Sequence, residues 1–114
     1  MRGENYFQFL GNLTKEPEGR DNVTMVGIVV EREYRSDGKR VKQKDYFTIF
    51  FYGVLARYTA EMLHTGDGIF VKGRIEHNSI YDDDGRPHSS YKFRAEHFSI
   101  VHRANKSLND KVYE

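Results

Sequence analysis

The sequence has 114 residues, which suits one domain, and its 18 Lys and Arg against 17 Asp and Glu leave a net charge of +1. That balance does not by itself indicate a nucleic-acid partner. There is no cysteine, which excludes disulfides, thiolate zinc sites and cysteine nucleophiles and agrees with a reducing cytoplasm. No apolar run is long enough to span a bilayer and the N-terminus lacks a signal-peptide core, so we expect a cytoplasmic protein with no membrane contact.

Hydrophobic residues alternate with polar ones along most of the chain, which is the period of a β-strand. This period predicts strands at residues 5–13, 22–34, 43–53, 69–81 and 91–101. Turns are predicted where Pro, Gly and Asp interrupt it, at residues 14–19 around Pro17, at Asp37-Gly38 and at 82–90. Gly73 breaks the side-chain row of the fourth predicted strand, as a bulge or a sharp barrel bend would.

Between the third and fourth predicted strands the period changes to that of a helix. Residues 54–66 would share one apolar face and end at a C-terminal cap on Gly66; the face consists of Leu55, Tyr58, Met62 and Leu63. Three strands, one helix and two strands is the order of the OB-fold, a five-stranded Greek-key barrel that binds oligonucleotides or oligosaccharides. We therefore predict an all-β OB-fold domain over residues 1–103, followed by a short polar tail over residues 104–114.

The third predicted strand is apolar on both of its faces. One face carries Tyr46, Thr48, Phe50 and Tyr52, and the other carries Phe47, Ile49 and Phe51. The second set is expected to fill a core, which leaves the first set for another partner. Phe47 and Phe50 are predicted to pack in the core or against another subunit.

Basic residues gather beside this strand, in residues 32–44. Six cations and two acids give that segment a local charge of +4; the cations are Arg32, Arg35, Lys39, Arg40, Lys42 and Lys44. Such a run is often only the solvated surface of a hairpin. Next to exposed aromatic rings it is also the pattern of a surface that binds phosphates and stacks bases.

Three segments in order resemble the bacterial-type single-stranded DNA-binding proteins, over roughly residues 5–102. They are NYFQFLGNLTKEPEGR near the start, DYFTIFFYGVLARYTAEMLHTGD in the middle, and GIFVKGRI after the predicted helix. The resemblance implies an OB barrel that assembles as a dimer or tetramer and coats single-stranded DNA without sequence preference. It implies a role in DNA replication, recombination or repair, and no cofactor.

The resemblance also implies which aromatic residues stack bases. The matching positions fall on Tyr34, Tyr46 and Tyr52, and a fourth falls on Ile80, which is not aromatic. Tyr81 is the candidate substitute, although adjacent strand residues face opposite ways. The basic residues expected on the DNA are Arg35, Lys39, Arg40, Lys42 and Lys44 in the hairpin, and Arg74, Arg86, Lys92 and Arg94 around the last loop. The alternative is that the aromatic residues pack against another subunit.

Proteins of this family commonly end in a flexible linker and an acidic tip that recruits replication and repair enzymes. This sequence ends in NDKVYE, so we do not expect that recruiting role. A compact, tailless version suggests a phage or another mobile element as the origin, as a hypothesis.

No catalytic or metal site is predicted. The acidic run Asp82 to Asp84 precedes Gly85 and is typical of a turn, and the five histidines show no metal-binding spacing. A second function stays open at this point: an OB-fold domain that mainly contacts proteins, such as a primosome-type accessory factor with weak nucleic-acid binding. The expected partner under the first interpretation is single-stranded DNA.

Overall fold

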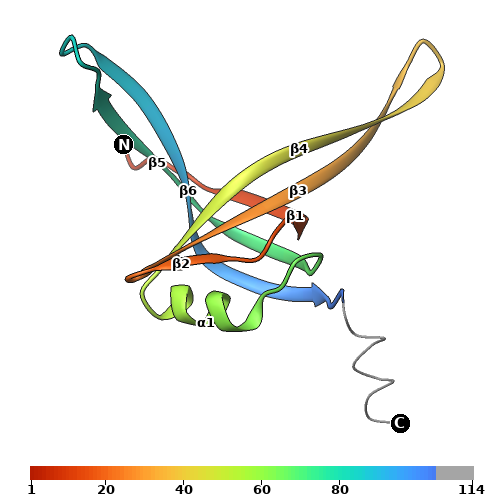
Figure 1. Ribbon diagram of the computed structural model, residues 1–114. Helices are drawn as coiled ribbons and strands as arrows, with labels where there is room; N and C mark the ends of the chain where they lie inside the picture. The colour runs from red at the N-terminus through yellow and green to blue at the C-terminus, as the bar shows by residue number, and fades with distance from the viewer. Residues whose placement is uncertain (105–114) are drawn as a thin grey trace.

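A computed structural model describes residues 1–104, so all but the first residue of the predicted tail lies outside the described residues. Figure 1 shows the strands and the single helix of this part of the chain. Its elements are β1 (Phe7–Leu13), β2 (Glu18–Arg20), β3 (Val23–Ser36), β4 (Lys39–Tyr52), α1 (Val54–Met62), β5 (Gly68–Tyr81) and β6 (Pro87–His102). In the described part of the chain, no helix has the length and apolar composition needed to cross a membrane.

The strands form one sheet that closes on itself. Their order is β1-β5-β6-β4-β3-β2, and an additional pairing of β1 with β3 closes a barrel of five strands. All pairings are antiparallel except that of β4 with β6. The predicted five-stranded barrel with one helix is therefore confirmed.

The short strand β2 was not predicted. Glu18–Arg20 lies in the segment predicted as a turn, yet it pairs antiparallel with the start of β3. Asp21, with a positive φ of 55°, supplies the tight turn between the two strands, a conformation that Asp tolerates better than most residues. Because of this extra strand, the helix follows the fourth strand rather than the third.

The β3–β4 hairpin turns at the predicted place. Asp37 and Gly38 have φ values of 53° and 75°, as a two-residue type I′ turn requires. Ser36 faces Lys39 across the turn, and the pairing then continues without a shift to Val23 and Tyr52. This unbroken register determines which residues of the two strands share a face.

The β5–β6 hairpin is longer than predicted. Pro87 already pairs with Tyr81, so the connection is a tight turn at residues 82–86 rather than a loop at 82–90. A proline is tolerated at the first residue of a strand. The Asp82 carboxylate accepts hydrogen bonds from the backbone N–H groups of Asp84 and Arg86, which explains the tightness of the turn.

Gly73 lies at a bulge, as predicted. The pairing of β5 with β6 shifts register between Lys72 and Gly73. A Cβ atom at Gly73 would lie 1.9 Å from the carbonyl oxygen of Arg94 and therefore could not be accommodated. The absence of a side chain allows β5 and β6 to approach closely where the barrel bends.

The core lies inside the barrel and under the helix. It consists of Phe7, Leu13, Val26, Ile28, Ile49, Phe51, Ala56, Leu63, Ile69, Val71 and Ala95. The predicted helical face was wrong in part. Tyr58 and Met62 are 52% and 40% exposed, whereas the helix buries Ala56 and Thr59.

The helix also ends earlier than predicted, at Met62 rather than at Gly66. Leu63 has an extended backbone and points into the core from outside the helix. The buried carboxylate of Asp67 accepts a hydrogen bond from the His64 backbone N–H, which holds the chain in its new direction. The helix packs with small residues because its backbone lies against the barrel, where the Thr24 hydroxyl donates to the Ala56 carbonyl at 2.6 Å.

Beyond the barrel, the β3–β4 and β5–β6 hairpins extend as two arms that diverge from each other (Figure 1). Most predicted DNA-binding residues lie on these arms or at their bases.

Candidate nucleic-acid interface

The two faces of β4 have different surroundings, as the sequence predicts. Ile49 and Phe51 are fully buried, and Phe47 packs against the core beside Phe9 and Phe93. On the opposite face, Tyr46 is 68% exposed. The outer face of β4 is therefore a surface row of Tyr46, Thr48, Phe50 and Tyr52, which we call the ring row.

Cations from β6 cover part of the ring row. Phe50 pairs with Arg94 across the parallel strands. The Arg94 guanidinium lies 4.3 Å from the centre of the Tyr52 ring, and the Lys92 amine lies 5.0 Å from the centre of the Phe50 ring. Both distances are within the range of a cation–π contact. Aromatic rings and positive charges thus alternate over one small area, which suits nucleotides because each offers a flat base and an anionic phosphate.

Among residues 1–104, one acid contacts this area. The Glu76 Oε2 atom on β5 lies 3.2 Å from Arg74 Nη2 and 3.6 Å from Arg94 Nη1. Glu76 also pairs in register with Lys92. A single carboxylate is therefore placed among three cations.

The basic hairpin is more nearly neutral than its sequence window indicates. Glu31 and Asp45 flank residues 32–44, so residues 31–45 hold six cations and four acids, a net +2. Four cross-strand ion pairs neutralise part of this charge. Arg32 pairs with Asp45 at 3.0 Å, and Lys44 pairs with Glu31 at 3.9 Å. Glu33 pairs with both Arg40, at 3.7 Å, and Lys42, at 3.9 Å. Among the described residues, Arg35 and Lys39 have no such ion pair.

Tyr34 does not share the face of Tyr46 and Tyr52. The continuous register pairs Tyr34 with Val41 and Tyr46 with Val29, which places the two tyrosines on opposite faces of the hairpin. Tyr34 is 42% exposed, and the guanidinium of Arg32 lies 5.3 Å from the centre of its ring.

The structure separates Tyr81 from the ring row in the same way. Tyr81 pairs with Pro87, whereas Ile80 pairs with His88 on the face that also carries Arg74 and Glu76. Tyr81 is 68% exposed, so it belongs to the opposite face of the β5–β6 arm. Its role as a substitute for the missing fourth aromatic residue stays a prediction.

The acidic run after β5 forms the turn between β5 and β6. The His88 ring atom Nε2 lies 2.8 Å from Asp82 Oδ2, and this contact with the His88 ring, together with the backbone N–H groups, lowers the pKa of the Asp82 carboxyl. Arg86 lies in this turn. Within residues 1–104, no group of three or more His, Asp or Glu side chains is arranged to hold a metal ion.

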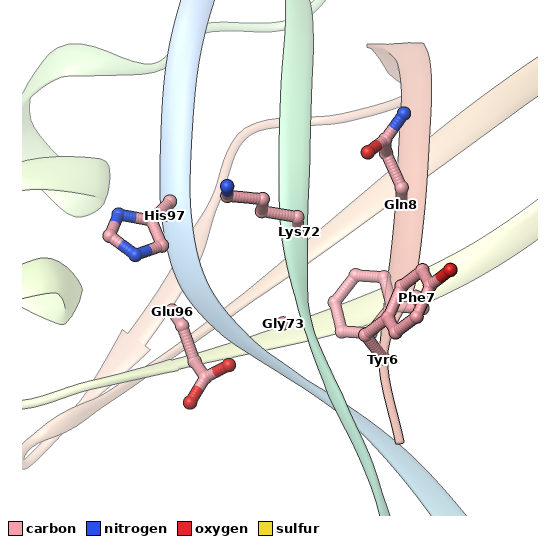
Figure 2. A pocket seen from close by; sticks show the side chains of 7 residues that line it. All are labelled: Tyr6, Phe7, Gln8, Lys72, Gly73, Glu96 and His97. Atoms are coloured by element: carbon pink, nitrogen blue, oxygen red, sulfur yellow. The ribbon is translucent and has the colours of Figure 1, made fainter. Parts of the chain in front are cut away.

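A separate hollow lies on the outer surface at the β5–β6 bulge (Figure 2). Its volume is about 400 Å³, and it is lined by Tyr6, Phe7, Gln8, Lys72, Gly73, Glu96 and His97. Figure 2 shows that Gln8, Lys72 and His97 come from three neighbouring strands. None of the DNA-binding residues predicted from the sequence lines this hollow.

Two residues of this candidate surface were not among the binding residues predicted from the sequence. Phe50 was assigned to core or subunit packing; it lies in the ring row under Lys92 rather than in the core, and its packing against another subunit stays a prediction. Glu76 was not considered. The alternation of β4 already placed Phe50 on the face of Tyr46 and Tyr52, whereas the contact with Lys92 depends on the pairing of β4 with β6, which is distant in sequence.

Comparison with known proteins assigns the chain to a family. Residues 4–101 match the profile of the Single-strand binding protein family. The chain belongs to this family. A relative named single-stranded DNA-binding protein, from Clostridium tetani, is 32% identical over 82 residues, which are 67% of this chain and 55% of the relative. The chain thus spans about half the length of this curated relative.

Solved structures of the family share the fold. The small single-stranded DNA-binding protein from Streptomyces coelicolor matches with a TM-score of 0.66 at 20% identity, over 92% of this chain and 99% of that one. A deletion mutant of the Thermus aquaticus single-stranded DNA-binding protein matches with a TM-score of 0.75 at 23% identity, over 91% of this chain and 53% of that one. The Plasmodium falciparum SSB complex with ssDNA matches with a TM-score of 0.73 at 14% identity, over 90% of this chain and 97% of that one. These similarities confirm the predicted OB-fold.

Proposed function

We propose that this member of the single-strand binding protein family binds single-stranded DNA without sequence preference and protects it during replication, recombination or repair. The observation that carries this proposal is the ring row of β4, with the cations of β6 lying over two of its rings. Stacking contributes typically 1–3 kcal/mol per base and tolerates any sequence because every base has a π-face. The C. tetani relative, which is named single-stranded DNA-binding protein, supports the same role.

The proposed binding surface starts from Tyr46, Phe50 and Tyr52 and the cations Arg74, Lys92 and Arg94. The other residues predicted from the sequence extend it along the two arms; they are Tyr34, Arg35, Lys39, Arg40, Lys42, Lys44, Tyr81 and Arg86. Tyr34 and Tyr81 lie on the opposite faces of their hairpins. A strand that contacts them in addition to the ring row must therefore pass around the edge of an arm.

One OB domain covers only about 4–16 nucleotides, so coating a long strand requires several copies. We therefore propose that the protein acts as a homo-oligomer, a dimer or a tetramer. The proposed site of action is the bacterial cytoplasm, or that of an infected host cell, in agreement with the absence of cysteine. We propose binding without catalysis.

The test is fluorescence anisotropy with a labelled oligo-dT at several salt concentrations, with duplex DNA of equal length as a competitor. Binding that weakens as salt is raised supports the proposal, because phosphate contacts release counterions. Binding that duplex DNA does not compete away supports it too, because stacking needs unpaired bases. Equal affinity for single strands and duplex contradicts it. That result would favour a domain that mainly contacts proteins.

A further inference from the structure

Glu76 lies where an anionic ligand of the proposed surface would bind. Its carboxylate is close to the guanidinium groups of Arg74 and Arg94, at 3.2 and 3.6 Å. The Glu76 side chain is 29% exposed, and those of Arg74 and Arg94 are 48% and 37% exposed. The cluster is accessible to a ligand, yet less hydrated than an ion pair on an open surface.

Arg94 connects this cluster to the ring row. Its guanidinium lies over the Tyr52 ring at 4.3 Å and also faces Glu76. A nucleotide that binds beside Tyr52 meets this guanidinium over the ring and brings a phosphate close to it. Because Arg pairs with carboxylate and phosphate through the same donors, the two anions compete for it.

We propose that Glu76 is an internal competitor for the DNA phosphate, which neutralises Arg74 and Arg94 while the surface is empty and gives way to a phosphate when a strand binds. This inference rests on the proposed function and names a residue that regulates the same site. Glu76 is a positioning residue, since it acts through Arg74 and Arg94 rather than on the DNA.

The exchange is reversible because partly exposed ion pairs are weak. A phosphate can therefore replace the carboxylate, and the carboxylate can later help to release the phosphate. The consequence is a lower affinity and a weaker dependence on salt than the local cations would otherwise give. Removing the charge of Glu76 should therefore strengthen binding, which is unusual for a substitution in a binding site.

The test compares Glu76→Gln with wild type by oligo-dT anisotropy at several salt concentrations. We expect affinity to rise about three- to tenfold at low salt, as two weak ion pairs no longer have to be broken. The slope of log K against log salt should be steeper than that of wild type, because Arg74 and Arg94 are no longer partly neutralised by a carboxylate while the surface is empty. The gain should therefore shrink as salt is raised.

Glu61→Gln on α1 is the matched control, because Glu61 is an exposed glutamate on the helix rather than on β4, β5 or β6, whose side chains form the proposed surface. If it raises affinity as much as Glu76→Gln does, only net charge matters and the proposal is overturned. A second control is Glu76→Gln in an Arg94→Gln background. The gain should fall there if Glu76 acts through Arg94, and an undiminished gain contradicts the proposal.

Failure of this proposal can be distinguished from failure of the proposed function. Wild-type protein that binds oligo-dT while Glu76→Gln shows no gain overturns the competitor role alone. Wild-type protein that does not prefer single strands overturns both. A thermal melt of each variant checks that the fold is retained, which we expect because Glu76 lies on the surface of the barrel.

Discussion

Replacing Tyr46 with Ala is the sharpest test of the ring row. Tyr46 is 68% exposed, and within the described part of the chain no cation lies over its ring. The ring is therefore available for a base, and its removal takes little buried area from the fold. Loss of one stacked base costs about 1–3 kcal/mol, which corresponds to about a 5- to 150-fold weaker Kd.

The assay is anisotropy with oligo-dT, repeated over a range of salt concentrations. Since tyrosine carries no charge at neutral pH, the slope of log K against log salt should stay that of wild type while the affinity falls. This combination separates lost stacking from lost phosphate contact. Thermal unfolding should shift only slightly, because the substituted side chain is on the surface.

Tyr58→Ala is the matched control. Tyr58 is 52% exposed and lies on α1, so the same atoms are removed outside the proposed surface. The reasoning is refuted if Tyr46→Ala weakens binding no more than Tyr58→Ala does. It is also refuted if Tyr46→Ala dissociates the oligomer while each protomer still binds normally, since Tyr46 would then be a subunit contact.

Three further outcomes are expected. Hydrogen bonds from Thr65, with a smaller contribution from His64, lower the pKa of Glu16 from 4.5 to about 2. The resulting stabilisation is fully present above pH 4.5 and is lost as pH falls through 2. In urea titrations, the difference in unfolding free energy between wild type and Glu16→Gln should therefore shrink over that pH range. A difference that stays constant would contradict the assignment. Gly73→Val should lower the free energy of unfolding by about 1–3 kcal/mol in a urea titration, because the Cβ of the introduced valine meets the backbone of β6. An unchanged midpoint would mean that the bulge can relax. Lys39→Ala should reduce the salt slope by about 0.7, whereas Lys15→Ala should not, and equal slopes would remove Lys39 from the DNA contacts.

Local signals were sufficient for much of the fold. The two faces of β4 follow from strand alternation, and the Asp37-Gly38 turn follows from the backbone conformation that a type I′ turn demands. The bulge at Gly73 follows from the missing side chain. By contrast, Glu18–Arg20 has no strand propensity of its own and becomes β2 only by pairing with β3.

The site was less predictable because it depends on pairings between distant segments. The contact of Arg94 with Tyr52 requires β6 to lie beside β4, which no local pattern indicates. The face of the hairpin on which Tyr34 lies could have been predicted from the sequence. Once the turn is set at Asp37-Gly38, counting residues back along both strands places Tyr34 and Tyr46 on opposite faces.

The unbroken pairing of β3 with β4 also bears on the order of assembly during folding. Ser36 and Lys39 are only three positions apart in sequence, so the hairpin can form from its turn on the microsecond scale. The pairing of Phe7 with Gly73, by contrast, joins remote parts of the chain. Barrel closure should therefore be the slow, late step. Substitutions beside the Asp37-Gly38 turn should then slow folding, while Phe7→Leu should mainly speed unfolding. Stopped-flow kinetics measure both rates, and the reverse pattern would show that β1 docks first. The arm proposed to bind DNA would then also be the segment on which the rest of the barrel is built.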